Sequence, residues 1–179
     1  MKFTLLCIKL ACLSTWNIGY DYYSQYFLFN LEDLNIYYFK LLQAILTPST
    51  TIENGKRVKY SIADSQRAFT VEVVQASDID AAVNQSNVFA NQPLIFAIGN
   101  KANYRQFVIV FDKTKHIFET YLGAIDFCFK LIKIFNLKYL SKCQNIWIFI
   151  QNFCYGMPIE KKYPKIQTFV NDLKRLMQE

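Results

Sequence analysis

The sequence lacks the short motifs that mark common catalytic and nucleotide-binding sites. It contains no GxGxxG, GxxxxGK[ST], HExxH or GxSxG pattern, and its 5 glycines are too scattered to form a phosphate-binding loop. Only 1 histidine is present, and none of the 5 cysteines forms a CxxC pair. These absences remove the usual signals for an enzyme, so we expect no catalytic residue, no metal site and no cofactor.

The cysteines also lack the spacing of a disulfide framework. They are Cys7, Cys12, Cys128, Cys143 and Cys154. An odd, irregular set favours free thiols and therefore a reducing, intracellular compartment. Cys128 or Cys154 would need a neighbouring base to act as a nucleophile, and the sequence offers none.

Long hydrophobic runs are missing as well. No apolar run reaches the roughly 18 residues needed to cross a bilayer, because charged residues interrupt each one. Hydrophobic residues make up 53% of the chain and charged residues 19%, which is typical of a globular protein. A chain of 179 residues then predicts one domain, with or without an appendage.

What is present is a pair of strongly apolar helices, expected at residues 121–136 and 143–155 and joined by a short link. Such a link predicts an antiparallel helical hairpin. The polar residues of each helix gather on one side; they are Asp126, Lys130, Lys133 and Asn136 in the first helix, and Gln144, Asn145, Gln151 and Asn152 in the second. Asp126 and Lys130 have the spacing of a helical ion pair. The rest, including Phe129, Trp147 and Phe153, should be buried.

The segments around this hairpin predict an α+β fold. We expect strands at 58–62, 69–73, 94–98, 106–111 and 115–119, with a turn at 63–65 and a type I′ hairpin turn at Asn54-Gly55. Ser77 and Asp80 predict a capped helix that runs to about Val88. A helix should follow Pro164. The predicted architecture is a small antiparallel meander packed against the helical hairpin and the C-terminal helix.

Residues 1–46 differ in composition from residues 47–179, which we expect to form the single α+β domain. The first segment is rich in Tyr and Phe. It is either helical or not part of the folded unit. A helix at 31–46 would use a face that contains Leu31, Leu34, Tyr38, Leu41, Leu42 and Ile45. The stretch after Met1-Lys2 resembles a secretory signal cleaved after Ser14, but Lys9 interrupts it, so an ordinary helix is favoured over secretion.

Few side chains remain as candidates for chemistry. His116 could act as a base oriented by Asp112 or Glu119, although an exposed histidine explains the pattern better. Asp78 and Asp80 form a carboxylate pair that helix capping explains better than metal binding.

The positive charges are the remaining candidate. The formal net charge is +6. The expected basic contact face consists of Lys130, Lys133, Lys138, Lys142, Lys161, Lys162 and Lys165. Such a face could contact phosphates or an acidic partner, and a solvated surface is the plainer explanation. Aromatic and basic residues fall on opposite helix sides, which argues against a stacking platform for single strands.

Several stretches resemble a family of uncharacterised animal proteins, abundant in arthropods and fish. The resemblance lies in IENGKRVKYSIADSQ (52–66), LIFAIGN (94–100), AIDFCFKLIKIFNLKY (124–139) and IWIFIQNFCY (146–155). It covers roughly residues 50–176. The family typically has Pro after the residue matching Tyr139, where this chain has Leu140. Its members are multicopy and look associated with mobile elements, and the resemblance implies no known reaction, ligand or site.

These observations lead to two functional hypotheses. The first is a non-enzymatic, intracellular module that binds a protein partner, because a large apolar hairpin is present without a polar constellation. The alternative is nucleic-acid binding through the basic face at 130–165, in a protein related to mobile elements.

Overall fold

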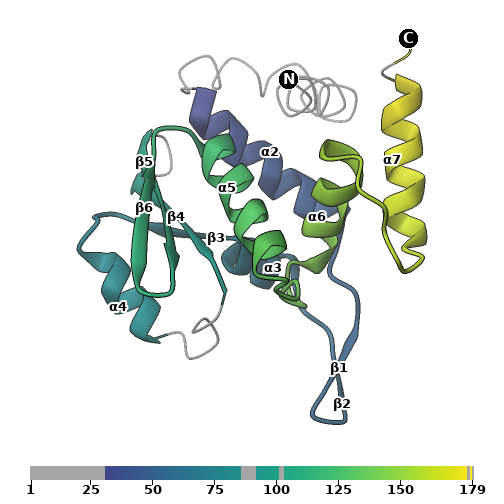
Figure 1. Ribbon diagram of the computed structural model, residues 1–179, viewed down its shortest axis with the longest axis horizontal. Helices are drawn as coiled ribbons and strands as arrows, with labels where there is room; N and C mark the ends of the chain where they lie inside the picture. The colour runs from purple at the N-terminus through teal and green to yellow at the C-terminus, as the bar shows by residue number, and fades with distance from the viewer. Residues whose placement is uncertain (1–30, 86–91, 101–102, 177, 179) are drawn as a thin grey trace.

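The computed structural model describes residues 31–85, 92–100, 103–176 and 178, and its elements follow one another as Figure 1 shows. The signal-like stretch lies outside these residues. The elements are α2 (Leu31–Ile45), β1 (Thr51–Glu53), β2 (Lys56–Val58), α3 (Ile62–Phe69), β3 (Thr70–Val73), α4 (Asp78–Gln85), β4 (Leu94–Asn100), β5 (Asn103–Phe111), β6 (Thr114–Phe118), α5 (Tyr121–Ile134), α6 (Gln144–Phe149), the π-helix η3 (Ile150–Cys154) and α7 (Pro164–Leu176). The predicted α+β class is confirmed.

A four-stranded sheet with the order β3-β4-β5-β6 forms the base of the fold. Strands β4, β5 and β6 make the predicted antiparallel meander. Strand β3 extends the sheet by pairing parallel to β4, with Thr70 opposite Ile95. The parallel pairing requires a crossover, and helix α4 lies in it. The strongly apolar β5 is an inner strand, with a neighbouring strand on each side.

The two faces of this sheet pack against different layers. Ile95, Ala97, Phe107 and Ile109 belong to the main core, which α2, α5, α6 and α7 complete. The other face forms a smaller cluster with Ile79 of α4. Figure 1 shows α5 crossing the sheet on one side while α4 lies at the other. Burial on both faces explains why β4 and β5 read as nearly continuous apolar runs.

The expected helical hairpin is present and forms the centre of the main core. Asp126, in the first half of α5, bonds Tyr155 just after η3, whereas Lys133, in the last turn of α5, bonds Gln151 earlier in η3. This order of contacts is that of an antiparallel pair. Phe129, Trp147 and Phe153 are each at most 6% exposed. Burial of such side chains is worth roughly 1.5–3 kcal/mol each, so this pair of helices is scaffold.

Helix α2 packs within the same core. Phe39 stacks on Phe69 at 5.8 Å between ring centroids and meets Tyr121 edge-on at 5.6 Å. Part of residues 1–46 therefore shares a core with residues 47–179. The predicted face is wrong in part, because Ile36 and Phe39 are buried whereas Ile45 is exposed. The helix carries apolar residues on several sides, so periodicity alone does not select the packed one.

The predicted strand at 58–62 and turn at 63–65 are also wrong. Strand β2 ends at Val58, and helix α3 begins at Ile62. Ser61 caps this helix: its hydroxyl accepts from the Asp64 N–H at 3.1 Å, and the Asp64 carboxylate accepts from the Ser61 N–H at 3.0 Å. This reciprocal capping box overrides the short alternation of apolar residues before it.

Helix α4 begins where expected, but not through the predicted pair. Asp78, rather than Asp80, accepts from the loop, with the Gln75 N–H at 3.0 Å. Asp80 instead forms an ion pair with Lys115 of β6 at 2.7 Å. Because α4 lies against the sheet, Asp80 is close to a lysine of β6. A prediction based on helix capping considers only neighbours in sequence and does not include this contact. The helix ends at Gln85, and the rest of its predicted length lies outside the described residues.

Candidate interaction surfaces

A polar cluster joins the two helices of the hairpin. Gln151 in η3 is its hub: Oε1 accepts from Lys133 Nζ at 2.7 Å and from the Tyr139 hydroxyl at 2.8 Å, and Nε2 donates to the Pro158 carbonyl at 2.5 Å. Lys133 Nζ also lies 4.9 Å from the centre of the Tyr139 ring. Burial lowers the pKa of Lys133 and raises the pKa of Tyr139. With all its polar atoms engaged, Gln151 fastens the helices together.

A second polar contact lies one turn earlier on α5. Lys130 Nζ pairs with Asp126 Oδ2 at 2.6 Å, which confirms the predicted helical ion pair. The Tyr155 hydroxyl donates to the other carboxylate oxygen of Asp126. Burial and this hydrogen bond to Asp126 raise the pKa of Tyr155. Asp126 thus connects the two helices as well as pairing within one.

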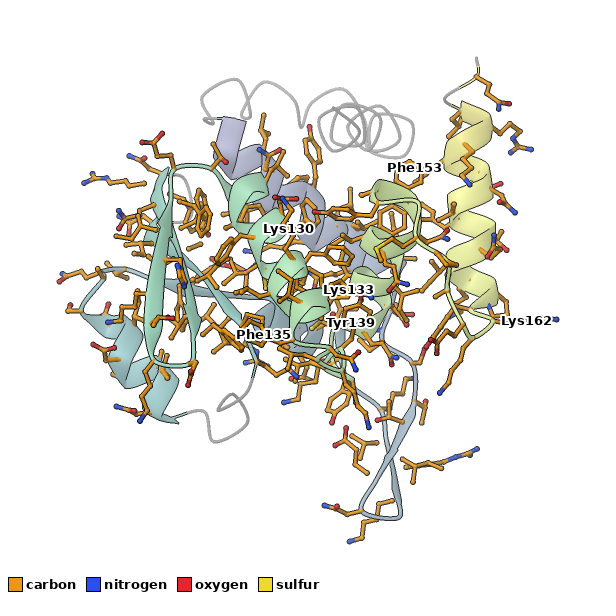
Figure 2. The ribbon with its side chains drawn as sticks, in the orientation of Figure 1. Lys130, Lys133, Phe135, Tyr139, Phe153 and Lys162 are labelled. Carbon is orange, nitrogen blue, oxygen red and sulfur yellow. The ribbon has the colours of Figure 1, made fainter. Side chains whose placement is uncertain are left out.

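The seven lysines of the predicted basic face occupy different environments. Lys130 and Lys133 are held by the contacts above, and Lys142 Nζ lies 5.5 Å from the centre of the Tyr60 ring. The exposed members are Lys130, Lys138, Lys161, Lys162 and Lys165. Figure 2 places Lys162 near the foot of α7, well away from Lys130 on α5. The lysines of 130–165 are therefore spread over several elements.

The structure does not assemble the histidine candidate. His116 lies on β6 with its ring against Phe127, at 4.9 Å between centroids, and its Nε2 is 3.3 Å from Thr114 Oγ1. Asp112 and Glu119 are exposed, and no carboxylate forms an ion pair with His116 within the part of the chain that the structure describes. This geometry places the imidazole in an aromatic contact.

The cysteines that the structure describes lie in apolar surroundings. Cys128 and Cys143 are buried free thiols, and Cys154 is half-buried. Each buried thiol is within 3.8 Å of a backbone carbonyl, that of Pro93 for Cys128 and that of Ala68 for Cys143. Burial raises the pKa of Cys143 to about 12, and that of Cys128 well above its usual range. Both thiols therefore stay protonated and behave as small apolar side chains.

Sequence reasoning missed an aromatic surface between α5 and β6, named here the α5–β6 strip. It consists of Phe111, His116, Phe118, Phe127, Leu131 and Phe135. Phe127 contacts Phe118 at 5.1 Å, and Phe135 contacts Phe111 at 5.1 Å. Ile134 and Phe135 are 75% and 56% exposed, so the prediction that the apolar residues of this helix are buried is wrong at its C-terminal end, where the sheet and the second helix do not cover them. A signal was available, because apolar residues at 127, 131 and 135 recur every four positions on a second side of the helix.

Figure 2 shows how α5 separates two surfaces. Phe135 lies at the C-terminal end of α5 on the side toward the sheet, whereas Lys133 and Tyr139 lie toward α6. The polar cluster therefore closes the inner side of the hairpin, and the strip is left on the outer side. Side chains on opposite sides of one helix can serve separate purposes.

Two other kinds of site are absent from the described part of the chain. Within the described ranges, no group of three or more His, Cys, Asp or Glu residues is placed to hold a metal ion. None of the helices described is long and apolar enough to span a bilayer. The resemblance to the arthropod and fish family stays a prediction, because comparison with protein-family models, with curated proteins and with solved structures gives no match for this chain.

Proposed function

We propose that this chain is a non-enzymatic protein-interaction module that binds its partner through the α5–β6 strip. The observation that carries the proposal is the exposure of Ile134 and Phe135, at 75% and 56%, beside half-buried aromatic rings. Large apolar side chains exposed together are typical of protein-binding surfaces, and aromatic residues are enriched there.

The geometry of the strip supports a specific contact. Phe127, Leu131 and Phe135 follow one line along α5, which spans roughly 12 Å at 1.5 Å per residue. Phe118 and Phe111 of the sheet border the two ends of this line. Because these rings already pack on one another, they would lose little side-chain freedom when a partner covers them. A short apolar segment of another protein fits such a surface.

The cysteines support an intracellular location for this module. Cys128 and Cys143 are free thiols that pack in the core. Proteins that keep buried free thiols are typical of reducing compartments. Rapid alkylation of the protein in cells, followed by unfolding and mass measurement, should find these two thiols unpaired, and a disulfide at either of them would contradict the proposal.

A photo-crosslinking residue at position 135 tests the protein-binding proposal. The captured protein is purified, and its affinity is measured for wild type, Ile134→Asp and Phe135→Asp. A charge in a desolvated contact should weaken binding at least tenfold, or about 1.4 kcal/mol. The control is Val74→Asp, a 64%-exposed residue just after β3, at the opposite edge of the sheet.

Two results would contradict this assignment. One is an equal loss of affinity in the Val74 control, which would indicate a general effect of charge. The other is no crosslink at position 135 together with a monomeric protein in solution. If the captured protein is a second copy of this chain, the strip is a self-association surface, and sedimentation of the Phe135→Asp variant should show a monomer.

Nucleic-acid binding through the lysines at 130–165 stays as a second proposal. The observation that favours it is the group Lys161, Lys162 and Lys165, all exposed around the start of α7. Electrophoretic mobility shift at two salt concentrations tests it, because phosphate contacts give binding that falls steeply with salt. A protein that causes no shift even at low salt would rule out this proposal.

A further inference from the structure

A small β-hairpin stands apart from the rest of the fold. Strands β1 and β2 pair antiparallel through the Asn54-Gly55 turn, where both residues have positive φ, at 50° and 75°. This is the type I′ hairpin that the sequence predicted. Figure 1 shows it extending clear of the helices and of the four-stranded sheet. We name residues 51–59 the β1–β2 arm.

The two faces of the arm differ in chemistry. Residues directly opposite in an antiparallel pair share a face, which puts Ile52 with Arg57 on one side and Glu53 with Lys56 on the other. Ile52 is 75% exposed, and Arg57 is exposed beside it. One face thus presents an apolar side chain next to a guanidinium, without a carboxylate.

The acidic groups near the arm are engaged within the protein. Glu53 accepts a hydrogen bond from the Thr51 hydroxyl at 3.5 Å, and a hydrogen bond to Glu53 raises the pKa of Tyr60 to about 12. Asp64 is used in the capping box of α3 and pairs with Arg67. The basic residues of the arm are not held in such contacts within the protein.

Three exposed basic residues lie on the arm: Lys56, Arg57 and Lys59. None of them forms an ion pair with another residue that the structure describes. A fourth positive charge lies at the base of the arm, where Lys142 Nζ is 5.5 Å from the centre of the Tyr60 ring. The positive potential of the arm is therefore available to a partner and continues onto the body of the protein.

We propose that the β1–β2 arm enters a groove of duplex DNA. A two-stranded ribbon fits the major groove, which is about 12 Å wide. Lys56, Arg57 and Lys59 would contact phosphates on the groove walls, and the exposed Ile52 would contact base edges such as the thymine methyl group. This surface is separate from the α5–β6 strip, and the proposal does not depend on the protein partner.

Shape favours duplex DNA over other polyanions. The arm is convex and narrow, so it suits a groove better than the flat face of an acidic protein. Duplex RNA has a deep, narrow major groove that side chains cannot read. Single strands are usually bound by exposed aromatic rings, and the only aromatic residue at the arm, Tyr60, is occupied by Glu53 and Lys142.

Mobility shift with a short DNA duplex tests this proposal, using the full chain and two variants of equal charge. The arm variant is Lys56→Ala with Arg57→Ala and Lys59→Ala. The matched control is Arg105→Ala with Lys113→Ala and Lys174→Ala, which also removes three exposed positive charges and lies outside both the arm and the lysines at 130–165. The arm variant should bind at least tenfold more weakly at about 50 mM salt, and the slope of log affinity against log salt should fall by about 2.7. The control should change neither quantity by a comparable amount.

Ile52→Ser adds a test of groove contact. It should weaken DNA binding severalfold without changing the salt slope, because the side chain touches bases and not phosphates. Thermal unfolding should be unchanged in all these surface variants, which separates loss of contact from loss of fold.

Four outcomes would overturn the proposal. No shift of the wild-type protein at low salt excludes DNA binding altogether. Equal losses in the two triple variants indicate attraction by net charge alone. A loss confined to the control places the DNA contact outside the arm. Equal affinity for duplex RNA or for polyglutamate, measured in parallel, shows a general polyanion surface instead of a DNA-binding arm.

Discussion

Replacement of Gln151 by leucine should destabilise the hairpin without altering its shape. Leucine nearly preserves the volume but removes the acceptor shared by Lys133 and Tyr139, and the donor to Pro158. A hydrogen bond from a charged group is worth about 1.5–3 kcal/mol and a neutral one about 1 kcal/mol. Because Lys133 is only partly buried, it regains some hydration. We therefore expect a loss of about 2 kcal/mol in the free energy of unfolding.

Urea denaturation followed by tryptophan fluorescence measures this change, since Trp147 is buried in the core. The midpoint should fall at constant slope, and the melting temperature should drop by about 4–8 °C for a domain of this size. Gln151→Glu keeps an acceptor for both Lys133 and Tyr139 and loses the donor to Pro158, so its stability should lie between wild type and Gln151→Leu.

The neighbouring residue provides the control. Asn152 makes one weak hydrogen bond, from Nδ2 to the Met157 carbonyl at 3.4 Å, so Asn152→Leu should cost less than about 0.5 kcal/mol. A double-mutant cycle between Gln151→Leu and Lys133→Met should show coupling of at least 0.5 kcal/mol. Equal costs at 151 and 152, or a cycle without coupling, would refute the assignment of Gln151 as the hub.

Three further predictions concern the scaffold. Asn145→Leu removes the bond from Nδ2 to the Thr47 carbonyl at 2.6 Å and should cost about 1–3 kcal/mol in urea denaturation; a loss below 0.5 kcal/mol would argue against it. Gly99 has φ +140° and an added Cβ would lie 2.3 Å from the Asn103 carbonyl oxygen, so Gly99→Ala should lower the melting temperature by at least about 4 °C, and an unchanged value would be contrary evidence. The pKa of Cys143 is raised to about 12, so its contribution to stability is present below pH 9 and lost as pH rises toward 12. Stability should therefore fall above pH 9 by up to about 1.4 kcal/mol per pH unit, and Cys143→Ala should reduce that slope; an unchanged slope would contradict the assignment.

The fold class and the long elements were predictable because their patterns are long. The continuous apolar runs of β4 and β5 and the apolar arcs of the two hairpin helices extend over many residues, so local exceptions do not obscure them. Even the ion pair of Asp126 with Lys130 follows from spacing alone. The hydrogen bond that the Tyr155 hydroxyl donates to the same carboxylate does not follow from spacing, because it depends on how one helix packs on the other.

The incorrect predictions share a physical cause: contacts with other parts of the fold, or a cap, determined which of two locally possible structures formed. Asn145 was expected on the polar side of its helix, yet it is buried and bonds to Thr47 in the segment that follows α2. The alternation that ends at Ile62 predicted a strand, but Ser61 and Asp64 close a capping box there. The second of these was readable, since Ser and Asp have the spacing of a helix start.

The candidate surfaces were harder to predict than the fold. The aromatic rings of the α5–β6 strip come from a helix and two strands, so only their assembly makes a surface. The turn of the β1–β2 arm was predicted. The separation of the arm from the core was not predicted, because a sequence pattern does not show which element stays outside the core. The lysines at 130–165 fall within one third of the sequence, but Figure 2 shows Lys130 on α5 and Lys162 near the start of α7 well apart.

The parallel pairing of β3 with β4 and the position of α2 bear on the order in which the protein can fold during synthesis. Phe39 near one end and Val170 near the other are both buried in a single core. The apolar residues of α2 therefore cannot be fully buried until the last helices have been synthesised. Such high contact order predicts slow folding and a need for chaperones while the nascent chain remains incomplete.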